Sequence, residues 1–439
     1  MIDGRDDVMA IPFDDLHALY PPSLRSLHIH LEHHGQSAIW MPDMPNALNP
    51  NCPNLRNAYF HNFNISLQHP LLIPQLTHLT LAIDPDAIET WNPPKFRDLT
   101  DILSRLSVLE SFTFQGELQR LHHEDNDIPT DTDGKRIDCP HLRDLLIDVY
   151  DPFHVLLLMS RLVLAPTARM SFVSRAGVPL SPDHPMLLRG FRSRMLSQED
   201  SPLAGMKTVQ WLTYAPHWAD ERDRLHIGPV PLWNARAIVC SAWRAGTSEY
   251  LKGDLKGHSE PPRPDWQLVF GLTDQHPYEF SPEGLIPFEA FAAAECISFR
   301  QRELQLLAPS ASAFEALFGH AQTLQCLRVD RKVGTRLLKE CAGIMARGSH
   351  TRPLGGVKEL LAFGINWGQD WTGNGDGGPD ITPYYIKLKE LIESAQTALQ
   401  DITIGKECEE LVYEEVGDKI RVHTAQLKGP ERNDFLFAF

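Results

Sequence analysis

A short apolar pattern, Leu-x-x-Leu-x-Leu, recurs along the chain and limits what the chain can fold into. Clear copies begin at Leu24, Leu76, Leu109, Leu142, Leu324 and Leu399, and weaker copies begin at Leu55, Val209 and Val357. The pattern is typical of the strand in a leucine-rich repeat. Because one strand and one returning helix cannot enclose a core alone, such units must stack on one another. The sequence therefore predicts an α/β leucine-rich-repeat solenoid, a curved parallel sheet with returning helices.

The returning helices are visible as apolar residues at helical spacing. This spacing is found over residues 95–106, 153–162, 314–321, 337–345 and 385–395. Each segment lies directly before or after a predicted strand, where a returning arm is needed. The alternation favours one continuous stack over separate globular domains.

The repeats are irregular in length. Successive first leucines from Leu24 to Leu142 lie 31, 21, 33 and 33 residues apart. We expect N-terminal repeats over residues 1–173, irregular repeats with insertion loops over 174–300, C-terminal repeats over 301–404 and a cap or tail over 405–439. Three apolar runs in the irregular part are interpreted as further strands of the same solenoid, with a separate inserted domain as the alternative: Ala237–Cys240, Trp266–Phe270 and Ile297–Phe299.

Charge and composition exclude several classes of partner. A net charge of −16, from 41 basic and 57 acidic residues, disfavours binding to a nucleic acid. The chain has no signal peptide pattern and no apolar stretch near the ~20 residues of a membrane span, so we expect no membrane partner and an intracellular, cytoplasmic or nuclear, location. Seven single cysteines without a C-x-x-C pair favour buried reduced thiols, and no cofactor is expected.

The side chains that alternate with the leucines define a candidate contact surface. Successive side chains of a strand point to opposite sides, so these residues face the inner, concave side of the solenoid. Aligning the first strands places His28 beside Tyr59 and Thr80, and His30 beside His61. The predicted protein-binding residues are His28, His30, Tyr59, His61, Thr80, Thr113, Gln115, Asp148, Trp211, Arg328 and Asp330.

The pairing of His30 with His61 raises the alternative of a zinc site. Neighbouring strands lie ~4.8 Å apart, so the two imidazoles would be able to share an ion, with His28 or His33 as a third ligand. No ligand spacing typical of zinc sites accompanies them, so we favour a polar surface without metal and without catalytic residues. The glycine-rich run 373–378 lacks the Lys-Ser/Thr end of a phosphate-binding loop and is interpreted as a loop between repeats.

Two predicted strands are preceded by a Cys-Pro-x-Leu sequence, which we call a C-P-x-L lead-in. It resembles the sequence that precedes strands in F-box/leucine-rich-repeat proteins and occurs as Cys52-Pro53-Asn54-Leu55 and Cys139-Pro140-His141-Leu142. Residues 139–172, together with VKELLAFGINW and ALQDITIGKEC near the C-terminus, are similar to segments of basidiomycete F-box-like proteins. The resemblance implies a substrate receptor, in which an F-box docks on the adaptor of a cullin ubiquitin ligase and the repeats hold the target. The residues before Leu24 are about half as long as a three-helix F-box requires, so the adaptor is an expected partner only if an F-box exists upstream.

We therefore predict a non-enzymatic protein that recognises an unidentified target protein through its concave face. Two alternatives stay open. One is a metal-dependent enzyme built on the histidine-rich first strands, and the other is an inactive truncated product of the F-box family.

Overall fold

The computed structural model of the chain has a mixed α/β fold in which most strands are parallel, as predicted. Residues 1–191 and residues 192–439 form two compact units. The boundary lies inside the segment 174–300 that was expected to be irregular. The structure describes residues 2–4, 23–31, 52–63, 65–83, 93–119, 136–165, 167–174, 193, 196, 203–214, 225–227, 230–232, 236–252, 262–272, 286, 288–301, 311–346, 354–365, 386, 388–390, 398–405 and 420–425.

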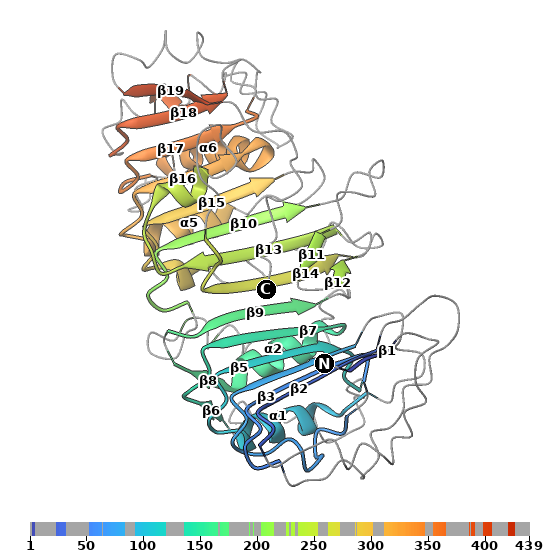
Figure 1. The fold of residues 1–439 in the computed structure, drawn as a ribbon. Helices are drawn as coiled ribbons and strands as arrows, with labels where there is room; N and C mark the ends of the chain where they lie inside the picture. Colours follow the sequence, from blue (N-terminus) through green and yellow to red (C-terminus); the bar gives the residue numbers. More distant parts are fainter. Residues whose placement is uncertain are drawn as a thin grey trace. The chain divides into compact units, whose positions relative to one another are not determined.

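In the first unit the main sheet is entirely parallel (Figure 1). Its strands lie side by side in the order β1 (Ile2–Gly4), β2 (Ser26–Leu31), β3 (Asn57–His61), β4 (His78–Ala82), β5 (Ser111–Gly116), β7 (Asp144–Val149) and β9 (Arg169–Ser174). A second, two-stranded parallel sheet joins β6 (Ile137–Cys139) to β8 (Leu162–Leu164). The helices α1 (Phe96–Arg105) and α2 (Pro152–Arg161) follow β4 and β7 in the chain.

The core of the first unit is built from two apolar rows that cross the sheet. One row aligns Leu27, Ala58, Leu79, Phe112 and Leu145, and the other aligns Ile29, Phe60, Leu81, Phe114, Ile147 and Phe172. All of these side chains are at most 6% exposed. Burial of each large apolar side chain contributes ~1.5–3 kcal/mol, so the rows hold the strands in register.

The helices form where the sequence supplies caps and apolar faces. In α1, Phe96, Leu99, Ile102 and Leu103 are buried, and the backbone N–H of Lys95 donates to Asp98. In α2 the carboxylate of Asp151 accepts a hydrogen bond from the N–H of Phe153, next to a proline at the first helical position. Both helices match predicted segments, 95–106 and 153–162.

Nine of the described strands begin in the same way. A tight turn closes on the first apolar residue of the pattern, as in Leu55 N–H to Cys52 O at 3.0 Å and Leu324 N–H to Ala321 O at 3.1 Å. The backbone carbonyl of the residue after that position then accepts hydrogen bonds from two successive N–H groups at the start of the next strand. The carbonyl of Arg56, for example, accepts from Thr77 and His78. The same arrangement recurs at Arg25, Thr77, Glu110, Lys207, Glu295, Gln325 and Lys358, and with a single N–H at Gln400. The C-P-x-L lead-ins are therefore turns that place the first leucine.

The second unit has a sheet of mixed direction. Its strands lie in the order β14 (Trp266–Leu272), β13 (Arg236–Trp243), β10 (Thr208–Tyr214), β15 (Cys296–Gln301), β16 (Cys326–Asp330), β17 (Glu359–Phe363), β18 (Asp401–Gly405) and β19 (Arg421–Ala425) (Figure 1). A small hairpin joins β11 (Leu225–Ile227) to β12 (Val230–Leu232). The helices are α5 (Ala311–His320), α6 (Arg331–Ala346) and the short 3-10 turns η3 (Ser248–Lys252) and η4 (Phe288–Phe291).

The expectation of parallel strands throughout is wrong in the middle of the chain. The three predicted runs are strands, β13, β14 and β15, but β13 pairs antiparallel with both β10 and β14. From β10 to β19 the other neighbours are parallel. The apolar runs of β13 and β14 lack the Leu-x-x-Leu-x-Leu spacing, and without it nothing in the sequence required them to run in the direction of the ladder.

The C-terminal helices occupy the predicted segments. α5 covers 314–320 of the expected helix and α6 includes 337–345. Of the predicted helix 385–395 the structure describes Ile386 and residues 388–390, which are helical.

Candidate functional site

Polar side chains occupy the face of the first unit's sheet that lies opposite the apolar rows. Strand pairing aligns His28, Tyr59, Thr80 and Thr113, which we name the His28 row. It also aligns His30, His61, Ala82, Gln115 and Asp148, which we name the His30 row. The predicted alignment of His28 with Tyr59 and Thr80, and of His30 with His61, is confirmed.

The His28 row is the more accessible of the two. His28 is exposed, and Tyr59, Thr80 and Thr113 are partly exposed. The imidazole of His28 stacks on the ring of Tyr59, with centroids 5.6 Å apart and planes inclined by 24°. Because neighbouring strands lie ~4.8 Å apart, the row extends for about 14 Å across the sheet.

The two histidines of the His30 row contact each other directly. His61 Nδ1 lies 3.2 Å from His30 Nε2, and the ring centroids are 4.5 Å apart with an interplanar angle of 67°. The Tyr59 ring stacks with His61 at a centroid distance of 6.3 Å. His30 is partly exposed, whereas His61 is only 8% exposed. The pair therefore lies at the border between surface and interior.

Gln115 and Asp148 are not surface residues, contrary to the prediction. Each is 1% exposed, and Gln115 Nε2 donates a hydrogen bond to a carboxylate oxygen of Asp148 at 3.3 Å. The alternation of side chains along a strand determines which face a residue occupies. It does not determine whether that face is open to solvent, and the prediction assumed that it was.

Arg328 and Asp330 are also wrongly predicted as accessible contact residues. They lie on the expected face of β16, but Arg328 is fully buried and Asp330 is 7% exposed. The guanidinium binds the carboxylate with both Nε and Nη2, at 3.2 and 3.1 Å. Its third nitrogen donates to the carbonyl of Leu251, and its Cζ lies 5.2 Å from the centroid of the Phe363 ring.

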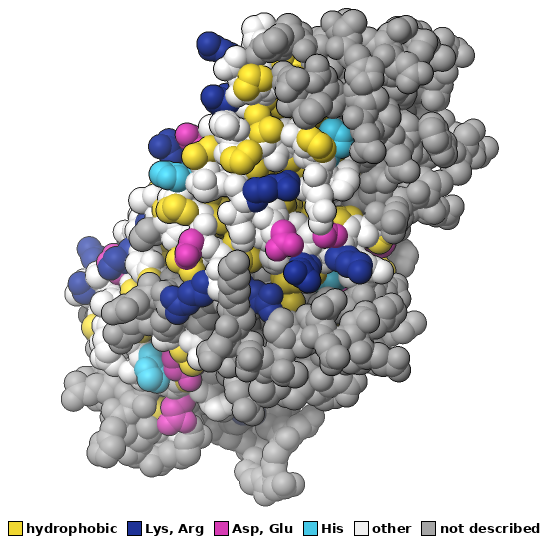
Figure 2. All heavy atoms as spheres, turned by 90° about the horizontal axis from the view of Figure 1, so that it is seen from below, with side chains coloured by type: hydrophobic (Ala, Val, Ile, Leu, Met, Phe, Trp, Pro, Cys, Tyr) yellow, Lys and Arg dark blue, Asp and Glu magenta, His cyan; other side chains and the backbone are white. Residues whose placement is uncertain are grey.

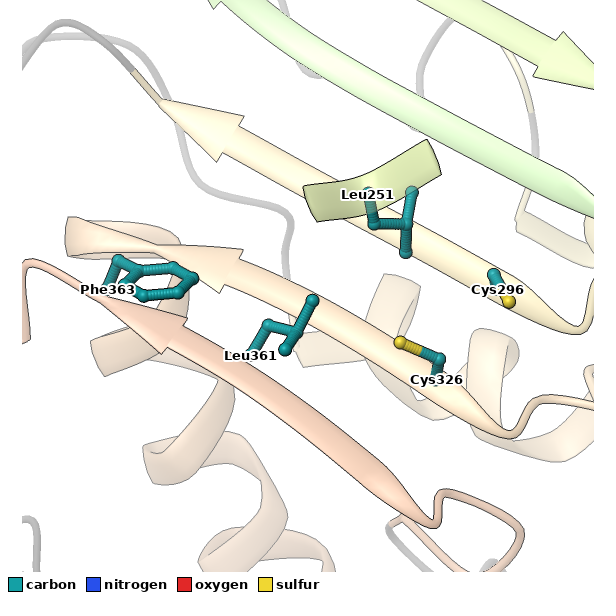
Figure 3. Packing of buried hydrophobic residues seen from close by; sticks show 5 residues of the cluster. All are labelled: Leu251, Cys296, Cys326, Leu361 and Phe363. Atoms are coloured by element: carbon teal, nitrogen blue, oxygen red, sulfur yellow. The ribbon is translucent and has the colours of Figure 1, made fainter. Parts of the chain in front are cut away.

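The element that buries these residues is η3, part of the connection from β13 to β14. Figure 3 shows Leu251 of η3 over the strands, in a cluster with Cys296, Cys326, Leu361 and Phe363. α6 packs against the opposite face, since its Gly334 lies next to Val329. The face of the second unit that was expected to bind a partner is therefore occupied, at β15 to β17, by the chain itself.

An ion pair fixes the end of η3. Lys252 Nζ lies 2.7 Å from Glu359 Oε1 on β17, and the two side chains are 15% and 23% exposed. Burial alone would lower the pKa of Lys252, but the hydrogen bond and charge of Glu359 outweigh it and raise the pKa. Lys252 therefore remains charged over the physiological range.

The cysteines beneath η3 form a pair that the sequence analysis did not single out. Cys296 and Cys326 are aligned on neighbouring strands and are 5% and 3% exposed. A hydrogen bond from Cys326 lowers the pKa of Cys296, while the same contact and burial raise the pKa of Cys326 well above its ordinary value. The signal that would have found the pair is the equal position of both cysteines, two residues after the first apolar residue of their strands.

Trp211 does not lie on the polar face. It is aligned with Phe299, which is aligned with Val329, so it belongs to an apolar row, and it is 2% exposed. The strand pattern begins at Met206 rather than at Val209, because Met206 closes the same tight turn as the first leucines elsewhere. Trp243 and Trp266 are buried too.

Among the described residues, no group of three or more His, Cys, Asp or Glu side chains is arranged to hold a metal ion. His33, named as a third ligand in the zinc hypothesis, and the glycine-rich run 373–378 lie outside the described residues. None of the described helices is both long enough and apolar enough to cross a membrane.

The described charges are distributed rather than gathered. In the view of Figure 2, Lys and Arg side chains are interspersed with Asp, Glu and hydrophobic side chains. The ion pairs follow the same pattern, with Arg97 beside Asp101, Arg143 beside Glu110 and Lys207 beside Glu295.

No model of a protein family matches the chain, and a search of curated proteins finds no relative. The polar face of the first unit is therefore the feature of the molecule that bears on its function.

Proposed function

We propose that the protein recognises another protein through the polar face of residues 1–191, as a leucine-rich-repeat solenoid similar to the substrate-binding part of an F-box receptor. The observation that carries the proposal is the His28 row, in which polar and aromatic side chains from four neighbouring strands are aligned and accessible. A surface assembled from many strands in register is how repeat proteins bind extended partners.

The leucine-rich-repeat assignment is supported by the way the strands begin. A tight turn closes on the first apolar residue, and the following carbonyl receives two N–H groups of the next strand, in both units. The recurrence explains why the number of residues between strands varies without loss of register, because only the turn and the strand are common to every repeat. It also supports Ala168, Met206 and Ala294 as first positions of strands with weak or absent leucine patterns.

The chemistry of the His28 row favours a protein ligand. The stacked rings of His28 and Tyr59 offer aromatic area together with hydrogen-bonding groups, and such residues contribute strongly to protein interfaces. Thr80 and Thr113 add uncharged hydroxyl groups without the cost of desolvating a charge. The net charge of −16 favours approach of a partner that carries a basic surface.

The proposal is tested by affinity purification of the full-length tagged protein followed by mass spectrometry, using wild type and a double variant, Tyr59→Ala with Thr113→Arg. We expect a reproducible partner with wild type that the double variant loses, because one substitution removes an aromatic contact and the other adds a long charged side chain to the row. Truncation of an aromatic residue that is a hot spot of an interface costs about 2 kcal/mol or more.

A matched control is Arg97→Ala, on the exposed side of α1, where the side chain is 81% exposed. The control should recover the same partner as wild type. Thermal unfolding of all three proteins establishes that the double variant is folded. Absence of a reproducible partner, or equal recovery by wild type and the folded double variant, contradicts the proposal. Recovery of a cullin-ligase adaptor together with the partner would extend the role to ubiquitin ligation.

A further inference from the structure

The geometry of the His30 row points to a second property, independent of protein recognition. We propose that His30 and His61 together form a binding site for one divalent ion of a late first-row transition metal such as zinc. The two residues are aligned on neighbouring parallel strands, β2 and β3, and their facing nitrogens, His30 Nε2 and His61 Nδ1, lie 3.2 Å apart.

The separation of the two nitrogens matches the requirement of a shared ion. Zinc binds imidazole nitrogens at 2.0–2.1 Å in tetrahedral geometry, which places two such ligands about 3.3 Å apart. Imidazole is a favourable ligand for zinc, copper and nickel. The remaining positions of a tetrahedral ion would be filled by water, so the site needs no further protein ligand to exist, although its affinity is lower than that of a structural zinc site.

Without metal, the same distance is that of a hydrogen bond in which one ring nitrogen donates to the other. One ring then holds its proton between the two nitrogens. When an ion binds, that proton moves to the other nitrogen of the same ring, so that both facing nitrogens present lone pairs. The χ2 torsion of histidine is broad, which allows each ring to turn its lone pair toward an ion. No net change in the charge of the rings is needed.

The surroundings favour a cation and hold the pair in place. Neither Lys nor Arg is present at the aligned positions of this face on β2, β3 and β4, which carry Ser26, His28, His30, Asn57, Tyr59, His61, His78, Thr80 and Ala82. The backbone behind the pair is fixed by the buried residues Ile29 and Phe60. Directly after His61, the N–H of Asn62 donates to the carbonyl of Ala82 at 2.8 Å. The pair is therefore ordered before an ion arrives, which reduces the cost of binding.

The test is calorimetric titration of zinc chloride into the metal-free, tag-free full-length protein. The variants are His30→Asn and His61→Asn. The matched control is His78→Asn, because His78 is exposed on β4 in a different row, with its Nδ1 2.9 Å from Thr77 Oγ1. We expect wild type and the control to bind one zinc ion at their tightest site with equal affinity. Each pair variant should weaken that site by more than about tenfold, equivalent to ~1.4 kcal/mol.

A second readout uses copper(II) and electron paramagnetic resonance, which counts the imidazole nitrogens around the ion. Wild type should show two, and each pair variant should show one. Circular dichroism of the metal-free variants establishes that they are folded; should His61→Asn unfold, the partly exposed His30→Asn decides the question. Absence of saturable zinc binding by wild type overturns the proposal, and so does a tightest site that is unchanged in folded His30→Asn.

Discussion

Replacement of Arg328 by methionine is expected to destabilise the second unit by about 3–5 kcal/mol, the cost of leaving one half of a buried ion pair alone. The structure gives the reasons. Arg328 is fully buried, Asp330 is 7% exposed, and the guanidinium makes two hydrogen bonds to the carboxylate and one to the carbonyl of Leu251. Each hydrogen bond to a charged group contributes ~1.5–3 kcal/mol, and methionine fills most of the volume without replacing any of them.

The assay is hydrogen exchange of the full-length protein, because a local measurement does not require the two units to unfold together. A loss of 3 kcal/mol corresponds to about a 100-fold fall in protection. We expect the amides of β16 and of η3 to lose protection by at least that factor. The double variant Arg328→Met with Asp330→Leu should recover most of it, because no unpaired charge is left buried and apolar replacement of a buried pair is often neutral or stabilising.

The control is Arg97→Met, the same substitution in an exposed pair. Arg97 Nε lies 3.7 Å from Asp101 one helical turn away, with side chains 81% and 63% exposed, so the expected loss is no more than about 0.5 kcal/mol. A loss below ~1 kcal/mol for Arg328→Met refutes the reasoning. An equal loss in the double variant shows instead that packing, and not the unpaired carboxylate, sets the cost.

Three further predictions follow from the described packing. Gly334→Ala should destabilise the second unit, because the new Cβ would lie 2.5 Å from Ile365 Cδ1. Gly319→Ala places its Cβ where no atom lies within 4 Å and should stabilise α5 by ~0.5–1 kcal/mol. Thermal unfolding of the two variants and of wild type compares them. Leu99→Ala, at a fully buried position of α1, should cost about 2–5 kcal/mol in urea unfolding of the first unit. Burial lowers the pKa of His154, and the charge of Asp151 opposes this effect. The neutral ring therefore stabilises the fold above pH ~6.5, and this contribution is lost as the pH falls toward the lowered pKa. The fall in melting temperature between pH 7.5 and pH 5.5 should be smaller for His154→Phe than for wild type.

The register of the first strands was predictable because it depends on local pattern alone. Apolar residues at alternate positions must all enter the core, and a shift by one residue would expose them, so aligning Leu27 with Ala58 and Leu79 also aligns His30 with His61. Trp211 was assigned to the wrong face by the same pattern. There the first apolar position is a methionine, the strand was aligned on the wrong residue, and an apolar side chain was assigned to the polar face.

The local sequence by itself determined which residues form strands and helices, and which side of each strand they face, because these properties depend on alternation, helical spacing and turns within a few residues. Tertiary structure alone decided what covers each face. Arg328 is buried because Leu251, 77 residues away in the sequence, lies over it. Contacts at such separations depend on how the insertions return to the sheet, and no pattern within a single strand contains that information.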